Sequence, residues 1–585
     1  MNKILQLKNC RTRIDLAILL KCKPSFLTFL LYKTKQEDHY EEFEIPKKTG
    51  GIRKICSPKG DLKLLQKRLS LLLLDCIDDI NSKNKIKNTL SHGFEREKSI
   101  ITNAEMHRGK KNVLNIDLNN FFDEFNFGRV RGFFISNKDF QLTPEVATTI
   151  AQIACYKNKL PQGGPASPVI TNLITHILDV ILSRLAKKNS CIYTRYADDI
   201  TFSTRKKLFP SGIMEETDAN IYIPSKSLNH EIKRAGFSIN SKKTRIQYKD
   251  SRQDVTGLTV NKKVGVKREY RQLTKSMCNS LFHTGEYTKK VNNEDVAGTL
   301  KELEGRINFI DSIDFYNRKK HPKKLSIHYQ QKNHGLNTRL LLSGREKLLS
   351  KFLFYKNFIG NDKVTILCEG KTDNIYIKSA LKTLVNNYPK LAEKKAEEPY
   401  KSYLNILNYS KRTKFFLELA GGTPYLNFFI KNYEKHYNFY KSVPAEKPVI
   451  IILDNDDGFK LIINTIKEIK NHTCLPYPNR RQTPIEYLKN ADLIHVTHNL
   501  YIILTPLSNG NDTMIENLFP PDLWNQDIQG RTFDPTEKLK PEENYYGKKT
   551  FATEVIAPNR DHINFDGFRP LFDRLTNVIE HYEKI

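Results

Sequence analysis

Apolar residues in the first hundred positions follow a helical spacing that is interrupted by one short hairpin pattern. Leucine and isoleucine recur every three or four positions through residues 62–80, which predicts an amphipathic helix. Ahead of it, two β-prone segments flank Gly50-Gly51, between Phe43 and Ile55. A glycine pair in that position favours the tight turn of a β-hairpin.

Between residues 110 and 260 the pattern changes to short strands separated by helical stretches. The predicted strands cover residues 113–116, 192–196, 200–203 and 254–260. Helical spacing returns from about residue 270 to residue 315. This mixture predicts an α+β domain.

A polar and basic stretch at residues 317–335 suits an exposed connector. Beyond it, a strand at 364–368 precedes a helix at 374–385, and residues 449–453 form an uninterrupted apolar strand. Such a strand is typical of a parallel sheet with both faces covered. We predict a first domain at 1–320, a basic linker at 321–345 and an α/β domain at 346–585.

Composition and charge narrow the class of protein. At 585 residues the chain is too long for one hydrophobic core, and its 39% apolar content argues against disorder. An excess of 95 Lys and Arg over 65 Asp and Glu gives a net charge of +30, which attracts polyanions. Nucleic acid is therefore the expected partner, although a merely well-solvated surface remains an alternative.

Cysteine spacing and hydropathy indicate where the protein acts. The nine cysteines stand singly, without the pairs that hold zinc or a clustered disulfide framework. No apolar run approaches the roughly 20 residues of a membrane span, and Arg11, Arg13 and Lys21 interrupt the N-terminal stretch. We expect a cytoplasmic protein without a membrane partner.

Two adjacent acids, Asp198 and Asp199, lie between β-prone segments and are predicted to occupy a hairpin turn. Neighbouring carboxylates repel unless a cation neutralises them, and hard oxygen ligands suit Mg²⁺. Asp117 ends the strand at 113–116 and is expected beside that turn as a third carboxylate. Three acids can hold two Mg²⁺ ions for nucleotidyl transfer. A solvated turn is the alternative for the acid pair taken alone.

The segment Tyr196-Ala197-Asp198-Asp199, together with Asp117, resembles the catalytic motifs of reverse transcriptases. The resemblance implies a right-hand polymerase, with fingers and palm at 1–265 and a thumb at 266–320. It further implies that dNTPs contact a fingers cation, an aromatic steric gate, a loop at 160–168 and the motif tyrosine. The matching residues are Arg53, Phe122, Gln162 and Tyr196.

Two further segments resemble bacterial retron reverse transcriptases in particular. They are Asn103-Ala104-Glu105-Met106-His107 and Val255-Thr256-Gly257. This resemblance implies a structured non-coding RNA as partner and DNA synthesis from a guanosine 2′-hydroxyl, which gives a branched RNA–DNA product. Candidate RNA-binding residues are Asn103, His107, Thr256 and Gly257. A mobile-element reverse transcriptase without a branched product is the alternative.

Acidic residues also follow two apolar strands of the second domain. Glu369 comes after the strand at 364–368, and Asp454 and Asp456 come after the strand at 449–453. Open α/β folds place ligands at such strand ends. This pattern resembles the TOPRIM domain of topoisomerases, primases and overcoming-lysogenization-defect nucleases. Further candidates are Asp373, Asp457, Glu516 and Lys549.

The TOPRIM resemblance implies a general acid/base role for Glu369 and a separate Mg²⁺ site at Asp454 and Asp456. It suggests a nuclease that acts as a toxic effector in anti-phage defence, with host or phage nucleic acid as substrate. The alternative is a domain that only binds nucleic acid. The sequence leaves the RNA, the trigger, the nuclease substrate and the oligomeric state open.

Overall fold

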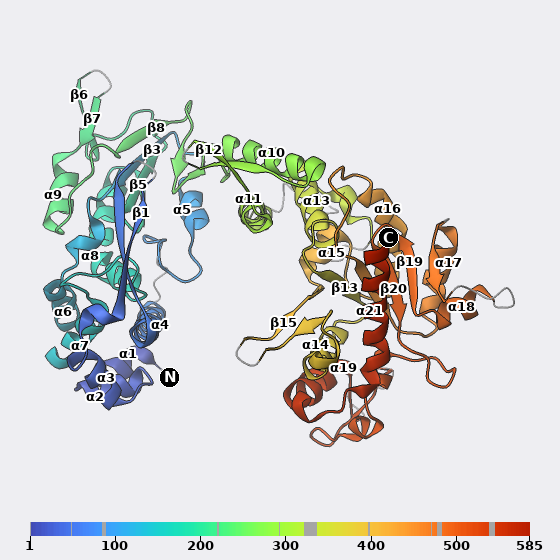
Figure 1. The fold of residues 1–585 in the computed structure, drawn as a ribbon. Helices are drawn as coiled ribbons and strands as arrows, with labels where there is room; N and C mark the ends of the chain where they lie inside the picture. Colours follow the sequence, from blue (N-terminus) through green and yellow to red (C-terminus); the bar gives the residue numbers. More distant parts are fainter. Residues whose placement is uncertain are drawn as a thin grey trace. The chain divides into compact units, whose positions relative to one another are not determined.

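The computed structural model describes every residue except 1, 48–49, 85–88, 219–220, 292, 321–335, 396–397, 470, 477–482 and 537–543. Most of the predicted linker at 321–345 thus lies outside the described residues. The chain forms two compact units, and Figure 1 labels their elements. The first unit contains Met1–Arg268 and Ile313–Asn317, and the second contains Glu269–Ser312 and Arg318–Ile585.

The first unit begins with three short helices, a hairpin and a long helix. These elements are α1 (Lys3–Asn9), α2 (Arg13–Leu19), α3 (Pro24–Tyr32), β1 (Tyr40–Pro46), β2 (Ile52–Pro58) and α4 (Gly60–Lys83). The predicted hairpin and the predicted helix are both confirmed. Gly50 and Gly51 have φ values of +87° and +82°, a conformation that favours glycine and reverses the chain between the strands.

A four-stranded antiparallel sheet forms the centre of the first unit, in the order β4-β5-β3-β8. Its strands are β3 (Asn112–Asp117), β4 (Cys191–Tyr196), β5 (Asp199–Thr204) and β8 (Arg245–Tyr248). Because strand side chains alternate, Leu114, Ile116, Ile200 and Phe202 enter the core that the helices share. These helices are α6 (Phe127–Ser136), α7 (Pro144–Ala154), α8 (Ser167–Lys188) and α9 (Lys226–Arg234).

Helix α8 corrects one expectation from hydropathy. By length and composition alone it is apolar enough to cross a membrane, whereas we expected no such run. Half of its most apolar window is buried inside the protein, and Leu178 and Leu182 are fully covered in the core. The apolar side chains of α8 thus have a packing role in this fold.

The predicted strand at 254–260 is two short strands instead, β9 (Asp254–Val255) and β10 (Leu258–Thr259). Thr256 and Gly257 have φ values of +47° and +82°, so the chain turns back between them. The Thr256 hydroxyl donates to the Ile100 carbonyl at 3.2 Å, at the start of α5 (Ile100–Met106). The two retron-like segments are thereby joined in one part of the unit.

The face of the sheet opposite the helical core holds a buried polar chain. Thr194 of β4 donates its hydroxyl proton to Asn103, so His107 Nε2 donates to Thr194 at 2.7 Å. The other ring nitrogen, Nδ1, then accepts from Ser203 of β5 at 2.7 Å. Asn103 and His107 are both fully buried. This corrects their predicted role in contacting RNA, because their contacts are with the strands that carry Asp198 and Asp199.

The second unit starts with two helices and an intervening hairpin that the sequence pattern did not predict. These elements are α10 (Arg268–Thr284), β11 (Thr288–Val291), β12 (Glu294–Ala297) and α11 (Leu300–Lys320). Leu281, Phe282 and Leu303 share a core with residues of α13 (Gly344–Phe358). The predicted thumb helices are therefore packed with the C-terminal part of the chain.

A six-stranded sheet organises the rest of the second unit, in the order β16-β13-β17-β20-β19-β18. Its strands are β13 (Val364–Cys368), β16 (Leu404–Ile406), β17 (Val449–Leu453), β18 (Thr473–Leu475), β19 (Leu493–Thr497) and β20 (Leu500–Leu504). Strands β16, β13, β17 and β20 run parallel. Strand β19 pairs antiparallel with both β20 and β18, so the expected parallel sheet is in fact mixed.

Helices cover both faces of this sheet, which explains the uninterrupted apolar strand at 449–453. Ile450 and Ile452 pack with α14 (Asp373–Thr383) and α21 (Arg569–Lys584). Ile451 and Leu453 face the opposite way and pack with α13, α16 (Thr423–Tyr437) and α17 (Phe459–Glu468). The helices are labelled beside the sheet in Figure 1.

The shared core predicts that truncating Phe282 destabilises the C-terminal sheet. Phe282 is 1% exposed and its ring lies 5.3 Å from Tyr440 and 5.9 Å from Tyr355. Phe282→Ala should cost about 3–5 kcal/mol, seen as faster amide hydrogen exchange in β17. Leu273→Ala, at a half-exposed position of the same helix, is the matched control. Unchanged exchange in Phe282→Ala would place α10 outside this core.

The buried histidine predicts a pH dependence of stability. Burial lowers the pKa of His107 from 6.5 to about 3. Between pH 6.5 and about pH 3, this imidazole is therefore protonated in the unfolded chain but neutral in the folded protein. Folding stability therefore falls as the pH drops below 6.5, by up to about 1.4 kcal/mol per pH unit. In urea titrations from pH 7 to 4, His107→Gln should flatten this slope. His230→Gln, an exposed position on α9, should leave it unchanged.

Candidate functional sites

The central sheet brings the three predicted carboxylates of the first unit to one end. Asp199 starts β5 and pairs with Tyr196 of β4 on one side and Asp117 of β3 on the other. Ala197 and Asp198 form the two-residue turn, in which Ala197 has a φ of +56°. The predicted hairpin turn and the predicted neighbour Asp117 are thus both found.

Lysine and asparagine side chains hold the first of these acids. Lys243 Nζ lies 2.9 Å and 3.1 Å from the two carboxylate oxygens of Asp117, and Asn240 Nδ2 donates to one of them at 3.1 Å. The backbone amide of Asn240 also donates to the backbone carbonyl of Asp117 at 2.8 Å. The sequence pattern assigns neither residue a role at this site, because nothing in their local sequence marks them as partners of Asp117.

Burial, together with the crowding of like charges, raises the pKa values of the other two acids. Desolvation by the surrounding protein, reinforced by the charges of Asp198 and Asp117, raises the pKa of Asp199 to about 7. Desolvation and the Asp117 charge also raise the pKa of Asp198, against the opposing effects of Lys243 and Arg53. The site therefore favours a bound cation, because a cation would stabilise the charged carboxylates.

The four residues predicted to contact the nucleotide lie on different elements of the first unit. Arg53 is exposed on β2, and its charge acts on Asp198. Phe122 is half-buried against Phe121, with ring centroids 5.5 Å apart, and Tyr196 is half-buried at the end of β4. The carbonyl of Gln162 accepts from the backbone amide of Cys56 at 2.9 Å.

The small residues of the loop at 160–168 serve packing within the protein. A Cβ atom on Gly163 would lie 3.0 Å from the Cys56 carbonyl oxygen, and Gly163 has a φ of +121°. A Cβ atom on Gly164 would lie 2.8 Å from Ser167 Oγ. The backbone of this loop therefore lies in close contact with β2 and with the start of α8.

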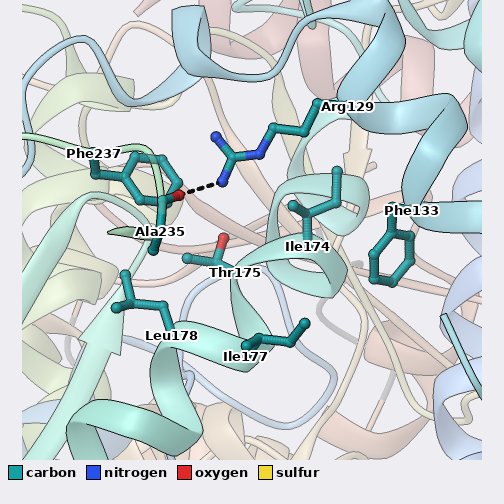
Figure 2. Close-up of a pocket in the computed structure, with 8 residues that line it drawn as sticks. All are labelled: Arg129, Phe133, Ile174, Thr175, Ile177, Leu178, Ala235 and Phe237. Atoms are coloured by element: carbon teal, nitrogen blue, oxygen red, sulfur yellow. Dashed lines mark hydrogen bonds between the residues drawn. The ribbon is translucent and has the colours of Figure 1, made fainter. Parts of the chain in front are cut away.

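A cavity of about 260 Å³ opens in the first unit away from the carboxylates. Figure 2 shows Arg129 at its edge, donating to the Ala235 carbonyl. The remaining lining residues are Phe133, Ile174, Thr175, Ile177, Leu178 and Phe237. None of the predicted site residues lines this cavity.

In the second unit, Glu369 follows β13 and is held by the loop before α16. One of its carboxylate oxygens accepts from the Thr423 hydroxyl and the other accepts from the Asp454 amide at 3.3 Å. The Gly422 amide donates to the Glu369 carbonyl at 2.8 Å. A Cβ atom on Gly421 would lie 2.9 Å from that carbonyl, so the glycine permits this close approach.

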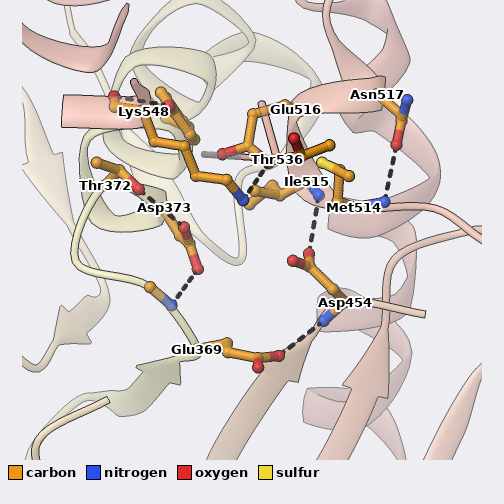
Figure 3. Close-up of polar contacts among 12 residues, drawn as sticks. Glu369, Thr372, Asp373, Asp454, Met514, Ile515, Glu516, Asn517, Thr536 and Lys548 are labelled. Atoms are coloured by element: carbon orange, nitrogen blue, oxygen red, sulfur yellow. Dashed lines mark hydrogen bonds and ion pairs between the residues drawn. The ribbon is translucent and has the colours of Figure 1, made fainter. Parts of the chain in front are cut away.

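Four acids and one lysine gather beside Glu369, as Figure 3 shows for most of them. Asp373 is 6% exposed and accepts from the Gly370 amide at 2.6 Å. Glu516 is fully buried and lies 3.1 Å from Lys548 Nζ. Burial, together with the charges of Asp373 and Glu516, raises the pKa of Asp454 to about 8. The Asp454 carboxylate accepts from the Ile515 amide at 2.8 Å.

Of the remaining candidates of this unit, one lies in the acidic cluster and two lie outside it. Asp456 belongs to the cluster, since its charge acts on Glu369 and its carboxylate accepts from the Gly458 amide. Asp457 points to solvent with a side chain that is 84% exposed, and it pairs with Lys460. Lys549 is exposed, whereas its neighbour Lys548 reaches the acids. The expectations for Asp457 and Lys549 are corrected accordingly.

Both clusters have the donor chemistry of a divalent-cation site. Within the described ranges, no three His, Cys, Asp or Glu side chains are already arranged around a metal position. The oxygen-only donor sets nevertheless fit Mg²⁺, which prefers carboxylates. In the second cluster, Glu516 Oε1 is buried and has no hydrogen-bond partner among the residues that the structure describes, so this oxygen is available to a cation. Residues Asp117, Asp198 and Asp199 would hold metal in the first unit.

Comparison with known proteins agrees with the geometry of the first unit. Residues 45–260 match the family of reverse transcriptases (RNA-dependent DNA polymerases). The Retron Ec86 reverse transcriptase of Escherichia coli is 34% identical over 268 residues, which cover 45% of this chain and 72% of that protein. The Retron Mx65 reverse transcriptase of Myxococcus xanthus is 31% identical over 294 residues, covering 47% of this chain and 62% of that protein.

Among solved structures, telomerase from Candida albicans in complex with a fragment of telomeric RNA aligns with 55% of this chain and 62% of that one. The TM-score is 0.27 at 11% identity, so the assignment of the first unit rests on the sequence relatives. The match to the reverse-transcriptase family covers residues 45–260, which contain Asp117, Asp198 and Asp199. The chain belongs to the family of retron reverse transcriptases.

Proposed function

We propose that the first unit is an RNA-directed DNA polymerase, and the observation that carries this is the meeting of Asp117, Asp198 and Asp199 at one end of the sheet. The primer hydroxyl oxygen forms a bond to the α-phosphorus of a dNTP while the bond to pyrophosphate breaks. Bound Mg²⁺ would supply charge for the attacking and leaving oxygens.

The chain's own residues prepare this site. Lys243 and Asn240 orient Asp117, so the carboxylate keeps its direction when a cation binds. Arg53, exposed on the β1–β2 hairpin, is proposed to bind the triphosphate. The half-buried ring of Phe122 is proposed to lie under the sugar and exclude a 2′-hydroxyl.

We further propose that the template is the enzyme's own structured RNA and that the product is branched, with the DNA joined to a guanosine 2′-hydroxyl. The names of the relatives, retron reverse transcriptases, support this. The net charge of +30 supports binding of folded RNA through its phosphates. We also propose that the protein is located in the bacterial cytoplasm.

The polymerase proposal predicts that Asp198→Asn abolishes DNA synthesis. The amide keeps the size of the side chain but cannot contribute the negative charge that holds a cation. In a primer-extension assay we expect a loss of at least about 100-fold, with RNA binding in a gel shift retained. Asp250→Asn, an exposed turn position in the same unit, is the control. Extension by Asp198→Asn at the wild-type rate would refute the assignment.

For the second unit we propose a TOPRIM-like nuclease that serves as a toxic effector in anti-phage defence. The support is the convergence of Glu516 with Glu369, Asp454 and Asp456, which follow the parallel strands β13 and β17. A separate Mg²⁺ ion would supply charge neutralisation there, and Lys548 offers a cation to a phosphate oxygen. The proposed substrate is host or phage nucleic acid.

A second candidate function is a module that binds nucleic acid without cutting it. Lys548 favours this alternative, because the carboxylates Glu516, Asp454 and Asp373 offset its burial, raise its pKa and keep the ammonium charged. A cluster that carries its own cation can be stable without metal. Cleavage assays distinguish the two candidates.

The nuclease proposal predicts that Glu369→Gln removes Mg²⁺- or Mn²⁺-dependent cleavage of labelled DNA or RNA by the full-length protein. Gln keeps an acceptor for Thr423 but removes the charge near Asp454. Asp457→Asn, at a solvent-exposed position of the adjoining loop, should cleave like the wild type. If host toxicity and phage protection persist undiminished in Glu369→Gln, the second unit acts by binding alone.

A further inference from the structure

A buried ion pair lies directly beneath the turn that carries Asp198 and Asp199. Arg195 of β4 and Asp179 of α8 are both fully covered. The guanidinium Nε and one terminal nitrogen each lie 2.7 Å from an Asp179 oxygen, which makes the pair bidentate. The Tyr193 hydroxyl donates to the same carboxylate at 2.7 Å. Asp179 thus fixes the plane of the guanidinium.

The remaining guanidinium nitrogen reaches the catalytic turn itself. Arg195 Nη1 donates to the Ala197 carbonyl at 3.0 Å. Ala197 has a φ of +56°, a conformation that an L-residue with a Cβ seldom adopts without support. Its carbonyl belongs to the peptide that leads into Asp198. The direction of this carbonyl therefore sets where the Asp198 side chain begins.

The turn is also closed from the other side. A Cβ atom on Gly93 would lie 2.7 Å from the Ala197 amide nitrogen, so only glycine fits there. The Gly93 carbonyl accepts from Asn172, another residue of α8. The backbone of Arg195 is bonded to the same segment, since the His92 amide donates to the Arg195 carbonyl at 2.8 Å. The turn has little room to relax in either direction.

We propose that Arg195, oriented by Asp179, is a positioning residue that holds the Ala197–Asp198 peptide in the geometry required for DNA synthesis. This inference rests on the proposed polymerase function. A buried ion pair is weak support for stability as such, because well-packed apolar residues often replace one without loss. The specific contribution of this pair is the third bond, from the guanidinium to the turn.

The test uses full-length protein with its RNA and two variants. The double variant Arg195→Met with Asp179→Leu removes both charges together, so no unpaired charge is left buried. Arg195→Lys keeps a positive charge beside Asp179 but lacks the planar fork that reaches both Asp179 and Ala197. Arg184→Met, at an exposed position of α8, is the matched control.

We expect both variants to unfold cooperatively and to bind RNA like the wild type. Their kcat for primer extension, per folded molecule, should fall on the order of 10- to 100-fold, because small displacements of reacting groups are costly. The KM for dNTP should stay within about twofold, and the Mg²⁺ concentration for half-maximal rate should rise, since the displaced carboxylates hold metal less well. Arg184→Met should match the wild type.

A wild-type kcat and Mg²⁺ requirement in the folded double variant would overturn the positioning role. A loss of activity that only follows the loss of folded protein, with normal kcat and Mg²⁺ dependence per folded molecule, would overturn it as well. If the double variant does not fold, Arg195→Lys decides by the same two readouts. Absence of DNA synthesis by the wild type would instead refute the polymerase proposal.

Discussion

Repulsion between carboxylates that are held close together and partly away from water is the interaction on which the first unit depends. The register of β3 against β5 forces Asp117 beside Asp199, and the turn adds Asp198. Lys243 donates to Asp117 and so offsets part of this repulsion, while the pKa values of Asp198 and Asp199 stay raised. A site of this kind is poised to take up divalent cations, as polymerisation requires.

The second unit also holds clustered carboxylates beside a lysine, although its sheet differs from that of the first unit. Glu369 and Asp454 follow neighbouring parallel strands, and Lys548 stands among the acids as Lys243 does in the first unit. The helices α10 and α11 share the core of this second unit.

Local patterns predicted the β1–β2 hairpin, helix α4 and the strands β3, β4, β5, β13 and β17, and they predicted the meeting of Asp117 with the hairpin turn, because strand ends and tight turns are local features. They could not predict which lysine contacts the acids of the second unit. Lys548 and Lys549 are adjacent in the sequence, and only the tertiary packing directs Lys548 toward the acids. They misassigned Asn103 and His107 because a motif does not reveal its burial. The β11–β12 hairpin was missed because its strands are almost entirely exposed and therefore lack the alternation of apolar and polar residues that marks a half-buried strand.

The proposed reaction is the copying of the protein's own RNA into DNA at the first acidic site. It is tested most directly by purifying the protein from its host and analysing the bound nucleic acid before and after treatment with debranching enzyme. We predict DNA that is joined to RNA and that separates from it after debranching. A linear DNA product would contradict the proposed branched product, and the absence of DNA would contradict the polymerase proposal itself.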